Sequence, residues 1–551
     1  MGRCDLTLKG IEDLSLAYGL NHYVIDKPLR DVLKVYLDSE PDLRTLGELA
    51  GRELYEIAYR VDRLSGPVLI TWSVRGDRVD SVWLDPAERL ILEKLIWDIG
   101  VNRYPFNGGS WHEHYASLNI IGDPGVSCIL TITIQTAYTL EKYAFEPVRS
   151  YYRSLSGLLK PTMFGATWFT EIQGGSDLGA NATVARESNG LWRLNGYKYF
   201  ASGAGLADVA LVTARTPGSP PGAKGLSLFA VPRVRRDGSL NFYVRRLKAK
   251  SGTIAVPTGE VELVDSEGYL VGEAGKGIYY ALESLMVSRL ANSHGALGIA
   301  RKAYLEAALY TAHRRAFGRR LVEHRLVRRD LLEAESLIEA GLVLAHEATE
   351  IFQRSSRDTP PYTPAYHYAR LLTHIAKNVT AEIALRVTAT SMELLGGLGF
   401  LTEYPVERWH REALITPIWE GTSNIQALDM LEVMAKKGAH KTLVEEMRGR
   451  AKETMNVDTS RKALTAIETT IEQMLVKQPE IVEYEAKDLL RKLGYAISAI
   501  LLENVATRLW EKRYHMIAEI ILERELLGRP IPLLNDGDFV DVVSLGGQIN
   551  I

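Results

Sequence analysis

The sequence predicts an α+β protein of four parts: a helical N-terminal domain, a central antiparallel β-barrel or sandwich domain, a four-helix bundle and a further helical extension. Apolar residues recur at helical spacing in the first part, for example over 91–99. Short apolar runs separated by Pro- and Gly-rich segments then predict strands, after which the helical period returns. The expected domains are 1–160, 161–275, 276–438 and 439–551.

Composition limits the function. The chain has 551 residues, 46% of them hydrophobic, which supplies several cores and excludes a disordered chain. A net charge of −3 argues against a polycation that coats nucleic acid. Two cysteines, Cys4 and Cys128, are too few for a disulfide framework. Residues 1–6 lack the apolar core of a signal peptide, and no apolar run approaches the roughly 20 residues that span a bilayer, so we expect a cytoplasmic protein.

Individual elements follow from local signals. Asp85-Pro86 predicts a helix start, and Asn195-Gly196 predicts a tight turn between strands at 191–194 and 197–200. Further strands are expected at 209–215, 226–231, 241–247 and 259–263. Helices are expected at 127–143, 279–313, 326–355 and 366–395, after Thr422, and at 459–476, 482–509 and 513–527, with an irregular tail over 530–551.

The segment Phe169-Thr170-Glu171-Ile172-Gln173-Gly174-Gly175-Ser176-Asp177 leads into the β domain. Its glycines allow backbone N–H groups to approach a ligand closely, and Ser176 adds a hydroxyl donor. The segment is either a structural turn or a cradle for a phosphate or a ring system.

Two further segments end or begin a helix. Met392 to Phe400 contains Gly396-Gly397, which is typical of a helix C-cap or of bare backbone beside a cofactor. Glu420 precedes the helix expected after Thr422. Beside apolar walls its carboxyl would have a raised pKa and serve as a base; alternatively it is a solvated residue near a helix start.

Residues 313–329 contain seven arginines and one acid. The run is a solvated face, a pocket for the phosphates of a dinucleotide or CoA, or a nucleic-acid patch. His112 and His114 form a lone pair of histidines, which is either a weak metal signal or two packed side chains; no metal site is expected.

Together, in this order, the four segments resemble the acyl-CoA dehydrogenase family of flavoproteins over roughly residues 80–435. The motifs are Thr-Glu-x-x-x-Gly-Ser-Asp, Arg-x-x-Phe-Gly, Gly-Gly-x-Gly-Phe and Glu-Gly-Thr-Ser. The AidB-like branch of that family is the most similar, because Thr170 to Asp177, Leu247 to Gly252, Glu393 to Gly397, Ile418 to Gly421 and the extension after 440 look like its versions.

The resemblance implies FAD as cofactor. Phe200 would pack beside the flavin, Ser202 would reach its N5 edge, and Arg314 and Phe317 would contact the ADP half across a subunit interface. The implied cofactor-binding residues are Thr167, Phe169, Thr170, Gly175, Ser176, Phe200, Ser202, Arg314, Phe317, Glu393, Gly396, Gly397, Thr422 and Asn424. A cofactor shared between chains implies a homo-oligomer, namely a dimer of dimers.

The resemblance also implies the chemistry. Glu420 would remove the α-proton of an acyl-CoA thioester, and the β-hydrogen would leave as hydride to flavin N5. Ser176, Arg289 and Gly421 would bind substrate, and an electron-transfer flavoprotein would accept the electrons. Met286 stands where the family usually has an acid that helps to hold CoA.

Three other functions remain open. An AidB-like flavoprotein of the alkylation or stress response would associate with DNA and turn over little acyl-CoA. Residues 441–551 hold 15 Lys and Arg against 18 Asp and Glu, which argues against DNA as the main partner of that block. A flavin-bound scaffold and an acyl-CoA oxidase are the remaining alternatives.

Overall fold

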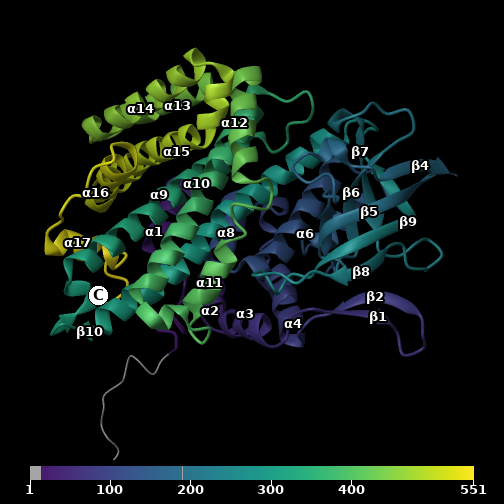
Figure 1. Ribbon diagram of the computed structural model, residues 1–551, viewed down its shortest axis with the longest axis horizontal. Coiled ribbons are helices and arrows are strands. Elements are labelled where there is room, and N and C mark those ends of the chain that lie inside the picture. Colours follow the sequence, from purple (N-terminus) through teal and green to yellow (C-terminus); the bar gives the residue numbers. More distant parts are fainter. Residues whose placement is uncertain (1–13, 189) are drawn as a thin grey trace, which may run out of the picture.

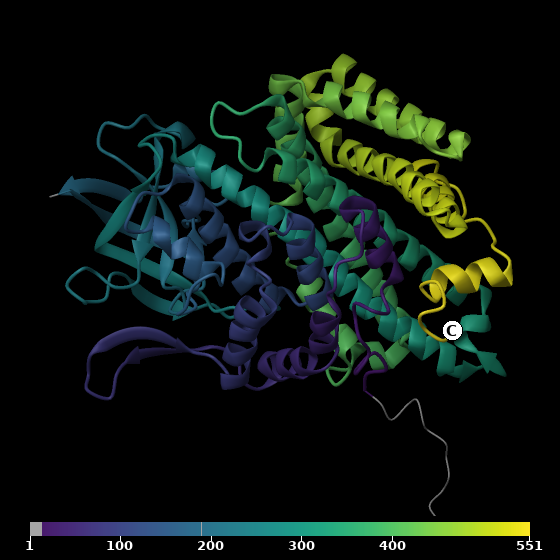
Figure 2. The same ribbon diagram turned by 180° about the vertical axis from the view of Figure 1, so that it is seen from behind.

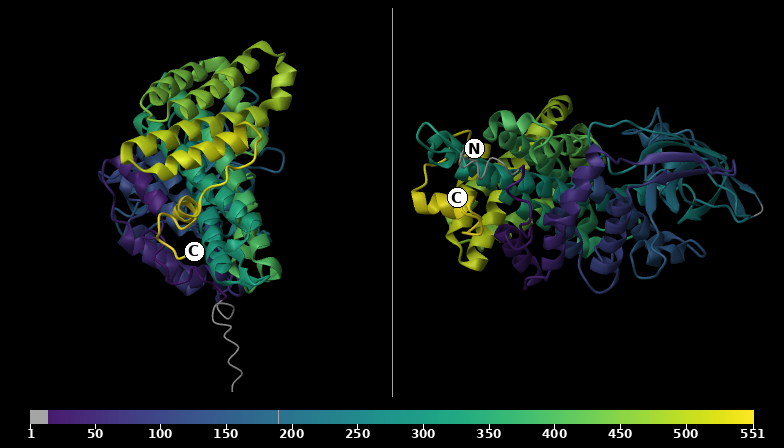
Figure 3. Two further views of the ribbon diagram at one scale, coloured as in Figure 1. Left: turned by 90° about the vertical axis from the view of Figure 1, so that its left-hand side faces the viewer. Right: turned by 90° about the horizontal axis from the view of Figure 1, so that it is seen from below.

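The computed structural model describes residues 14–188 and 190–551 (Figure 1). The expectations that concern Cys4 and residues 1–6 lie outside the described residues. A β domain occupies one end of the molecule, long helices run away from it, and the C-terminus lies at the opposite end (Figure 3). No helix of the described ranges is long and apolar enough to cross a bilayer.

The N-terminal part is helical with one β-hairpin that the sequence did not predict. Asp26, Asp85 and Asp123 each cap a helix by accepting a bond from a backbone N–H of its first turn, and each of these helices has a proline at its first or second position. The hairpin lies beside the β domain (Figure 3). The elements are α1 Lys27–Leu37, α2 Arg44–Gly51, α3 Glu53–Arg63, β1 Val68–Trp72, β2 Arg78–Trp83, α4 Pro86–Lys94, α5 Trp111–Ile121, α6 Pro124–Tyr143 and α7 Tyr152–Leu155.

Seven strands form the β domain. Their order is β3-β6-β4-β5-β9-β7; β8 pairs with β9, and pairing of β6 with β7 closes the sheet on itself. The domain is mainly antiparallel as predicted, but β6 runs parallel to both β3 and β4. The strands are β3 Gly165–Trp168, β4 Val184–Ser188, β5 Leu191–Ser202, β6 Val209–Arg215, β7 Leu226–Pro232, β8 Tyr243–Leu247 and β9 Thr258–Val271.

The turn predicted at Asn195-Gly196 is wrong, because both residues lie inside the continuous strand β5. The pairing with β9 shifts register between Leu194 and Gly196, where Asn195 lies opposite two residues of β9, Val264 and Asp265, so β9 forms a bulge at this point. A Cβ on Gly196 would lie 2.2 Å from Thr183 Oγ1, and Asn195 Oδ1 accepts a bond of 2.9 Å from Asp265 N. Close strand contact, and not chain reversal, therefore requires this glycine.

The long helices match the predictions within a few residues. The bundle consists of α8 Gly277–His313, α9 Arg325–Ser355, α10 Pro364–Leu394 and α12 Ser423–Lys437, with α11 Pro405–Ala413 beside them. The extension comprises α13 Ala439–Lys452, α14 Val457–Val476, α15 Pro479–Leu509, α16 Lys512–Ile521 and α17 Asp536–Val543. Helix α13 was not predicted, and α17 corrects the expectation of an irregular tail, because Asn535 caps a short helix that buries Phe539.

The extension covers one side of the bundle (Figure 2). A Cβ on Gly494 of α15 would lie 2.5 Å from Val379 of α10, and Ser498 Oγ donates to the carbonyl of Ala340 over 2.9 Å. Arg513 forms a fully buried ion pair with Glu339 of α9. Helix α15 therefore shares its core with the bundle of its own chain.

Candidate active site

Glu420 lies in the turn between α11 and α12, in a left-handed backbone conformation. Its φ is +58°, and that of Gly421 is +95°. Arg289 Nε and Gln426 Nε2 donate to the carbonyl of Glu420 over 2.8 and 3.1 Å. Lys377 Nζ donates to the carbonyl of Gly421 over 2.8 Å. Donors from three helices thus hold the turn and offset the left-handed conformation of Glu420, which costs about 1–3 kcal/mol for a residue other than glycine.

The carboxylate of Glu420 faces α8, where Ser288 Oγ donates to its Oε2 over 2.8 Å. Burial raises the pKa of Glu420, and the Ser288 bond, Arg289 and Lys377 oppose that rise. Burial also lowers the pKa of Lys377 to about 7. A carboxylate with a raised pKa, held in one orientation, is suited to remove a proton near neutral pH.

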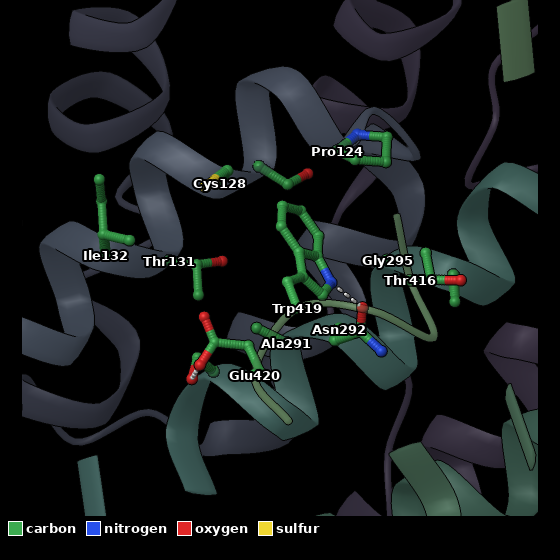
Figure 4. Close-up of a pocket in the computed structure, with 13 residues that line it drawn as sticks. Pro124, Cys128, Thr131, Ile132, Ala291, Asn292, Gly295, Thr416, Trp419 and Glu420 are labelled. Atoms are coloured by element: carbon green, nitrogen blue, oxygen red, sulfur yellow. Dashed lines mark hydrogen bonds between the residues drawn. The ribbon is translucent and has the colours of Figure 1, made fainter. Parts of the chain in front are cut away.

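A narrow pocket opens beside Glu420 between α6 and α8, with about 410 Å³ of free space when its open mouth is included (Figure 4). Its wall is mostly apolar, with Glu420 and Ile132 toward one end and Pro124 and Thr416 toward the other. It can accept a slender apolar chain next to the base. The lining residues are Pro124, Ser127, Cys128, Thr131, Ile132, Ser288, Ala291, Asn292, Gly295, Ala296, Thr416, Trp419 and Glu420.

The β-domain residues expected to hold the flavin lie at the end of β3, in the loop that follows it and at the end of β5. Thr167, Thr170 and Ser202 are partly exposed, whereas Gly175, Ser176 and Phe200 are exposed. Ser202 Oγ lies 3.2 Å from Thr258 Oγ1, and its carbonyl accepts from Trp168 Nε1 over 2.9 Å. The ring of Phe169 is buried in a hydrophobic cluster, so only its backbone remains for a ligand.

Sequence reasoning missed the part played by Glu171. Its carboxylate accepts bonds from Lys198 Nζ over 2.7 Å and from the backbone N–H of Ala182 over 2.7 Å. Burial opposes ionisation, but Lys198 and these donors hold the pKa of Glu171 below its ordinary value. This ion pair fixes the loop that carries Thr170 and Ser176. Alternation along β5, which turns Lys198 inward, was the available signal.

The other expected cofactor residues lie at the far end of the bundle. Arg314 precedes a small hairpin, β10 Arg315–Ala316 and β11 Arg319–Arg320, whose tip holds Phe317 with 95% of its surface exposed. Figure 1 places this hairpin opposite the β domain. Glu393, Gly396 and Gly397 are exposed at the end of α10. One chain therefore does not bring these residues to those of the β domain.

The remaining expected residues flank Glu420. Arg289 is buried and engaged with the Glu420 carbonyl, and Gly421 leaves no room for a side chain, because a Cβ would lie 2.7 Å from Gln426 Nε2. Thr422 precedes α12 but its side chain makes no capping bond within the described structure; Asn424 is exposed on its first turn. Met286 is buried in the core.

The histidine pair is packed in the interior. His112 Nδ1 lies 2.9 Å from His346 Nδ1, and His114 Nδ1 lies 2.8 Å from the carbonyl of Val101. Over the part of the chain that the structure describes, no group of three or more His, Cys, Asp and Glu side chains could hold a metal ion.

A helical, a β and a second helical region follow one another along the chain, and a carboxylate lies at an apolar cavity between helices, which is the arrangement of an enzyme that removes a proton from a substrate with an apolar chain. Two family models match: the acyl-CoA dehydrogenase middle domain over residues 166–266 and the C-terminal domain over 275–435. The AidB protein of Escherichia coli strain K12 is 31% identical over 429 residues, which cover 73% of this chain and 76% of that protein. The chain belongs to the acyl-CoA dehydrogenase family, which confirms the resemblance read from its motifs.

Two further comparisons agree. The short-chain specific acyl-CoA dehydrogenase of Clostridium acetobutylicum is 30% identical over 359 residues, covering 63% of this chain and 90% of that one. The structure of Caenorhabditis elegans ACDH-11 in complex with C11-CoA has the same fold, with a TM-score of 0.82, 24% identity, and coverage of 95% and 94% of the two chains. The protein is a flavin oxidoreductase that acts on the CH–CH bond of acyl-CoA, and its cofactor is FAD.

Proposed function

We propose that the protein desaturates an acyl-CoA thioester between its α and β carbons, with Glu420 as the base. The observation that carries this proposal is the carboxylate itself: it is held by Ser288 in the wall of an apolar cavity, with a raised pKa. An acyl chain that enters the cavity would present its α-carbon to this group.

The residues present fit FAD, which supplies the hydride acceptor when bound. The exposed edge of the β domain offers hydroxyls at Thr170, Ser176 and Ser202. Gly396 and Gly397 offer open backbone, because a Cβ on either would meet nothing within 4 Å among the described residues. Arginine at 314 suits a pyrophosphate.

Residues of the chain itself would supply the base, the group that polarises the thioester and the support of the turn. Glu420 takes the α-proton at its carboxylate, and the backbone N–H of Glu420 polarises the thioester carbonyl. An acyl chain that fills the apolar cavity would exclude water and strengthen both interactions. Lys377, Arg289 and Gln426 keep the turn in place while the carboxylate gains its proton.

The separation of the two cofactor-binding groups supports an oligomer. Phe317 and Gly396 lie at the opposite end of the folded molecule from Ser202. A second copy of the chain would therefore have to supply them to the same FAD, as happens in a dimer of dimers. An electron-transfer flavoprotein is the proposed electron acceptor, and the proposed location is the cytoplasm.

An anaerobic titration of the FAD-loaded protein with acyl-CoAs of increasing chain length tests the function. Bleaching of the flavin by one chain class, and its loss in Glu420→Gln, is the expected result. If the FAD-loaded protein binds acyl-CoAs but none of them bleaches the flavin, the proposed desaturation is wrong.

Association with DNA, as an AidB-like protein of the alkylation response with little acyl-CoA turnover, is the second candidate. The observation in its favour is the exposed set Arg315, Arg319 and Arg325. Acids of the same chain offset part of the cluster, because Arg328 pairs with Asp536 over 2.7 Å. Salt-dependent duplex binding that Arg319→Glu abolishes would support this candidate.

A further inference from the structure

The turn that carries Glu420 rests on the buried side chain of Gln426, in the first turn of α12. Gln426 Nε2 donates to the carbonyl of Glu420 over 3.1 Å and to the carbonyl of Gly421 over 2.9 Å. A carbonyl oxygen only accepts hydrogen bonds. The NH₂ end of the Gln426 amide must therefore face the turn, and its oxygen must face the other way.

The oxygen end of this amide meets His374 on α10. His374 Nδ1 lies 2.8 Å from Gln426 Oε1, and both side chains are buried. An amide oxygen has no hydrogen to donate, so the hydrogen of this bond must be on Nδ1. The ring is therefore either the neutral tautomer with its hydrogen on Nδ1 or the doubly protonated imidazolium.

The surroundings of His374 decide between these two forms. Burial, together with the positive charges of Arg289, Arg370 and Lys377, holds the pKa of His374 well below its ordinary value. The carboxylate of Asp429 lies 3.7 Å from His374 Nε2, which is too long for a hydrogen bond, and it also faces Arg289 over 3.6 Å. At neutral pH the ring is thus uncharged, with its hydrogen on Nδ1 alone.

The opposite tautomer would reverse the amide. With its hydrogen on Nε2, His374 would offer a lone pair at Nδ1, and Gln426 would turn its NH₂ end toward that lone pair. The amide oxygen would then face the carbonyl oxygens of Glu420 and Gly421, where like partial charges repel. The hydrogen on Nδ1 therefore determines whether Gln426 supports the turn.

We propose that His374 is a positioning residue for the base: by donating from Nδ1 to Gln426, it orients the amide that holds the turn of Glu420. This inference rests on the proposed function, because the turn aims the carboxylate and the backbone N–H of Glu420 at the substrate. His374 and Lys377 lie one turn apart on α10, so one face of this helix supports the turn at two points.

A matched pair of substitutions tests the donor. His374→Asn keeps an N–H donor attached to Cγ, as Nδ1 is, whereas His374→Leu has nearly the shape of asparagine but no donor. In the FAD-loaded protein with saturating acyl-CoA, His374→Leu should slow flavin bleaching about ten- to hundredfold, since a misplacement of about 1 Å can cost about a hundredfold. His374→Asn should recover most of that rate.

The binding of substrate should not change with the rate. The dissociation constant of acyl-CoA is measured from the perturbation of the flavin spectrum in a Glu420→Gln background, where no turnover occurs. His374→Leu should leave this constant close to that of Glu420→Gln alone, because the bond from His374 holds the base and not the acyl chain. A constant that weakens as much as the rate would assign His374 to substrate binding and overturn the positioning role.

If His374 acts through Gln426, the effects of the two residues should not add. Gln426→Leu should slow bleaching at least as much as His374→Leu does. Adding His374→Leu to Gln426→Leu should then have little further effect, whereas two independent defects would multiply their losses.

The matched control is His114→Leu on α5. His114 is equally buried, its Nδ1 lies 2.8 Å from the carbonyl of Val101, and its Nε2, like that of His374, has no hydrogen-bond partner among the described residues. This variant should lower the melting temperature, as His374→Leu does, but keep the bleaching rate. An equal loss of rate in both variants would mean general destabilisation and would overturn the positioning role.

A second measurement does not depend on the folding of His374→Leu. Nitrogen chemical shifts of the protein labelled with nitrogen-15 histidine report the tautomer of each ring, and the signal that disappears in His374→Asn belongs to His374. We expect a neutral ring with its hydrogen on Nδ1 between about pH 6 and 8. A ring with its hydrogen on Nε2 would overturn the inference.

The outcomes separate the two proposals. Bleaching of the unaltered protein with an unchanged rate in His374→Leu, or with equal losses in His374→Asn and His374→Leu, overturns the positioning role and leaves desaturation standing. If no acyl-CoA bleaches the unaltered protein, the proposed function is wrong, and the role of His374 in it is wrong as well.

Discussion

Lys377 Nζ lies 2.8 Å from the carbonyl oxygen of Gly421, so a buried ammonium supports the residue that follows the proposed base. The same charge lowers the pKa of Glu420, against the burial that raises it. Lys377→Met removes the charge and the bond, and the pKa of Glu420 should rise. Because the base acts ionised, the acidic limb of the rate of flavin bleaching should move to higher pH, with a lower plateau.

The control for that prediction is Lys436→Met on α12, where the ammonium is exposed and pairs with Glu432 over 3.3 Å. Its pH profile should match that of the unaltered protein. A Lys377→Met protein whose acidic limb does not move would contradict an electrostatic effect of Lys377 on Glu420.

Gly421→Ala should distort the turn that carries Glu420. The φ of +95° disfavours any side chain, and a Cβ would lie 2.7 Å from Gln426 Nε2. A displaced Glu420 should slow bleaching by about ten- to hundredfold, since about 1.4 kcal/mol corresponds to a factor of ten. Gly449→Ala, in the last turn of α13 where a Cβ meets nothing within 4 Å among the described residues, is the matched control and should retain the rate. Unchanged bleaching in Gly421→Ala would show that the turn tolerates a side chain.

Local sequence signals account for much of the architecture. Asp85-Pro86 marks the start of α4, and the apolar period predicts α8, α9, α10 and α15 within a few residues. The four motifs predict the family, and with it FAD. These signals work because helix caps and periodicity depend on residues that are close in sequence.

Contacts between distant residues could not be predicted from such signals. The bulge of β9 opposite Asn195 depends on the pairing of two distant strands, and the support of Gly421 comes from Lys377 on α10. The burial of Phe169 follows from a hydrophobic cluster to which Ala137 and Leu140 of α6 also belong. The hydrogen bond that Trp419 Nε1 donates to Asn292 Oδ1 likewise joins residues that are 127 positions apart in the sequence.

We expect Glu171→Gln to weaken the binding of FAD. The pair with Lys198 is buried, and removing one partner leaves an uncompensated charge, which costs about 3–5 kcal/mol. Burial already lowers the pKa of Lys198 to about 8, so the ammonium would lose its proton more readily. We expect a lower melting temperature and faster loss of flavin on dilution.

The exposed pair of Asp458 and Arg461 provides the control, and Asp458→Asn should change neither quantity. The double variant Glu171→Leu with Lys198→Met should recover the melting temperature more than the flavin affinity. It restores the packing of the interior but not the hydrogen bonds that fix the loop. Full flavin retention in Glu171→Gln would refute the positioning role.

Glu88 should make the stability of the N-terminal part depend on pH. Its side chain is buried in α4, and neither carboxyl oxygen has a partner within the described residues. Burial, with the nearby Asp123 and Asp85, raises the pKa of Glu88 to about 8. The folded state therefore keeps a proton that the unfolded chain releases near pH 4.5, and this group's contribution to stability decreases as pH rises between those values, by about 1.4 kcal/mol per unit.

Glu88→Gln lacks this titration. Urea unfolding at pH 5.5, 7 and 8.5 should show a growing advantage of Glu88→Gln that levels off above pH 8; an advantage that is constant across the range would mean that Glu88 is ionised in the folded protein throughout.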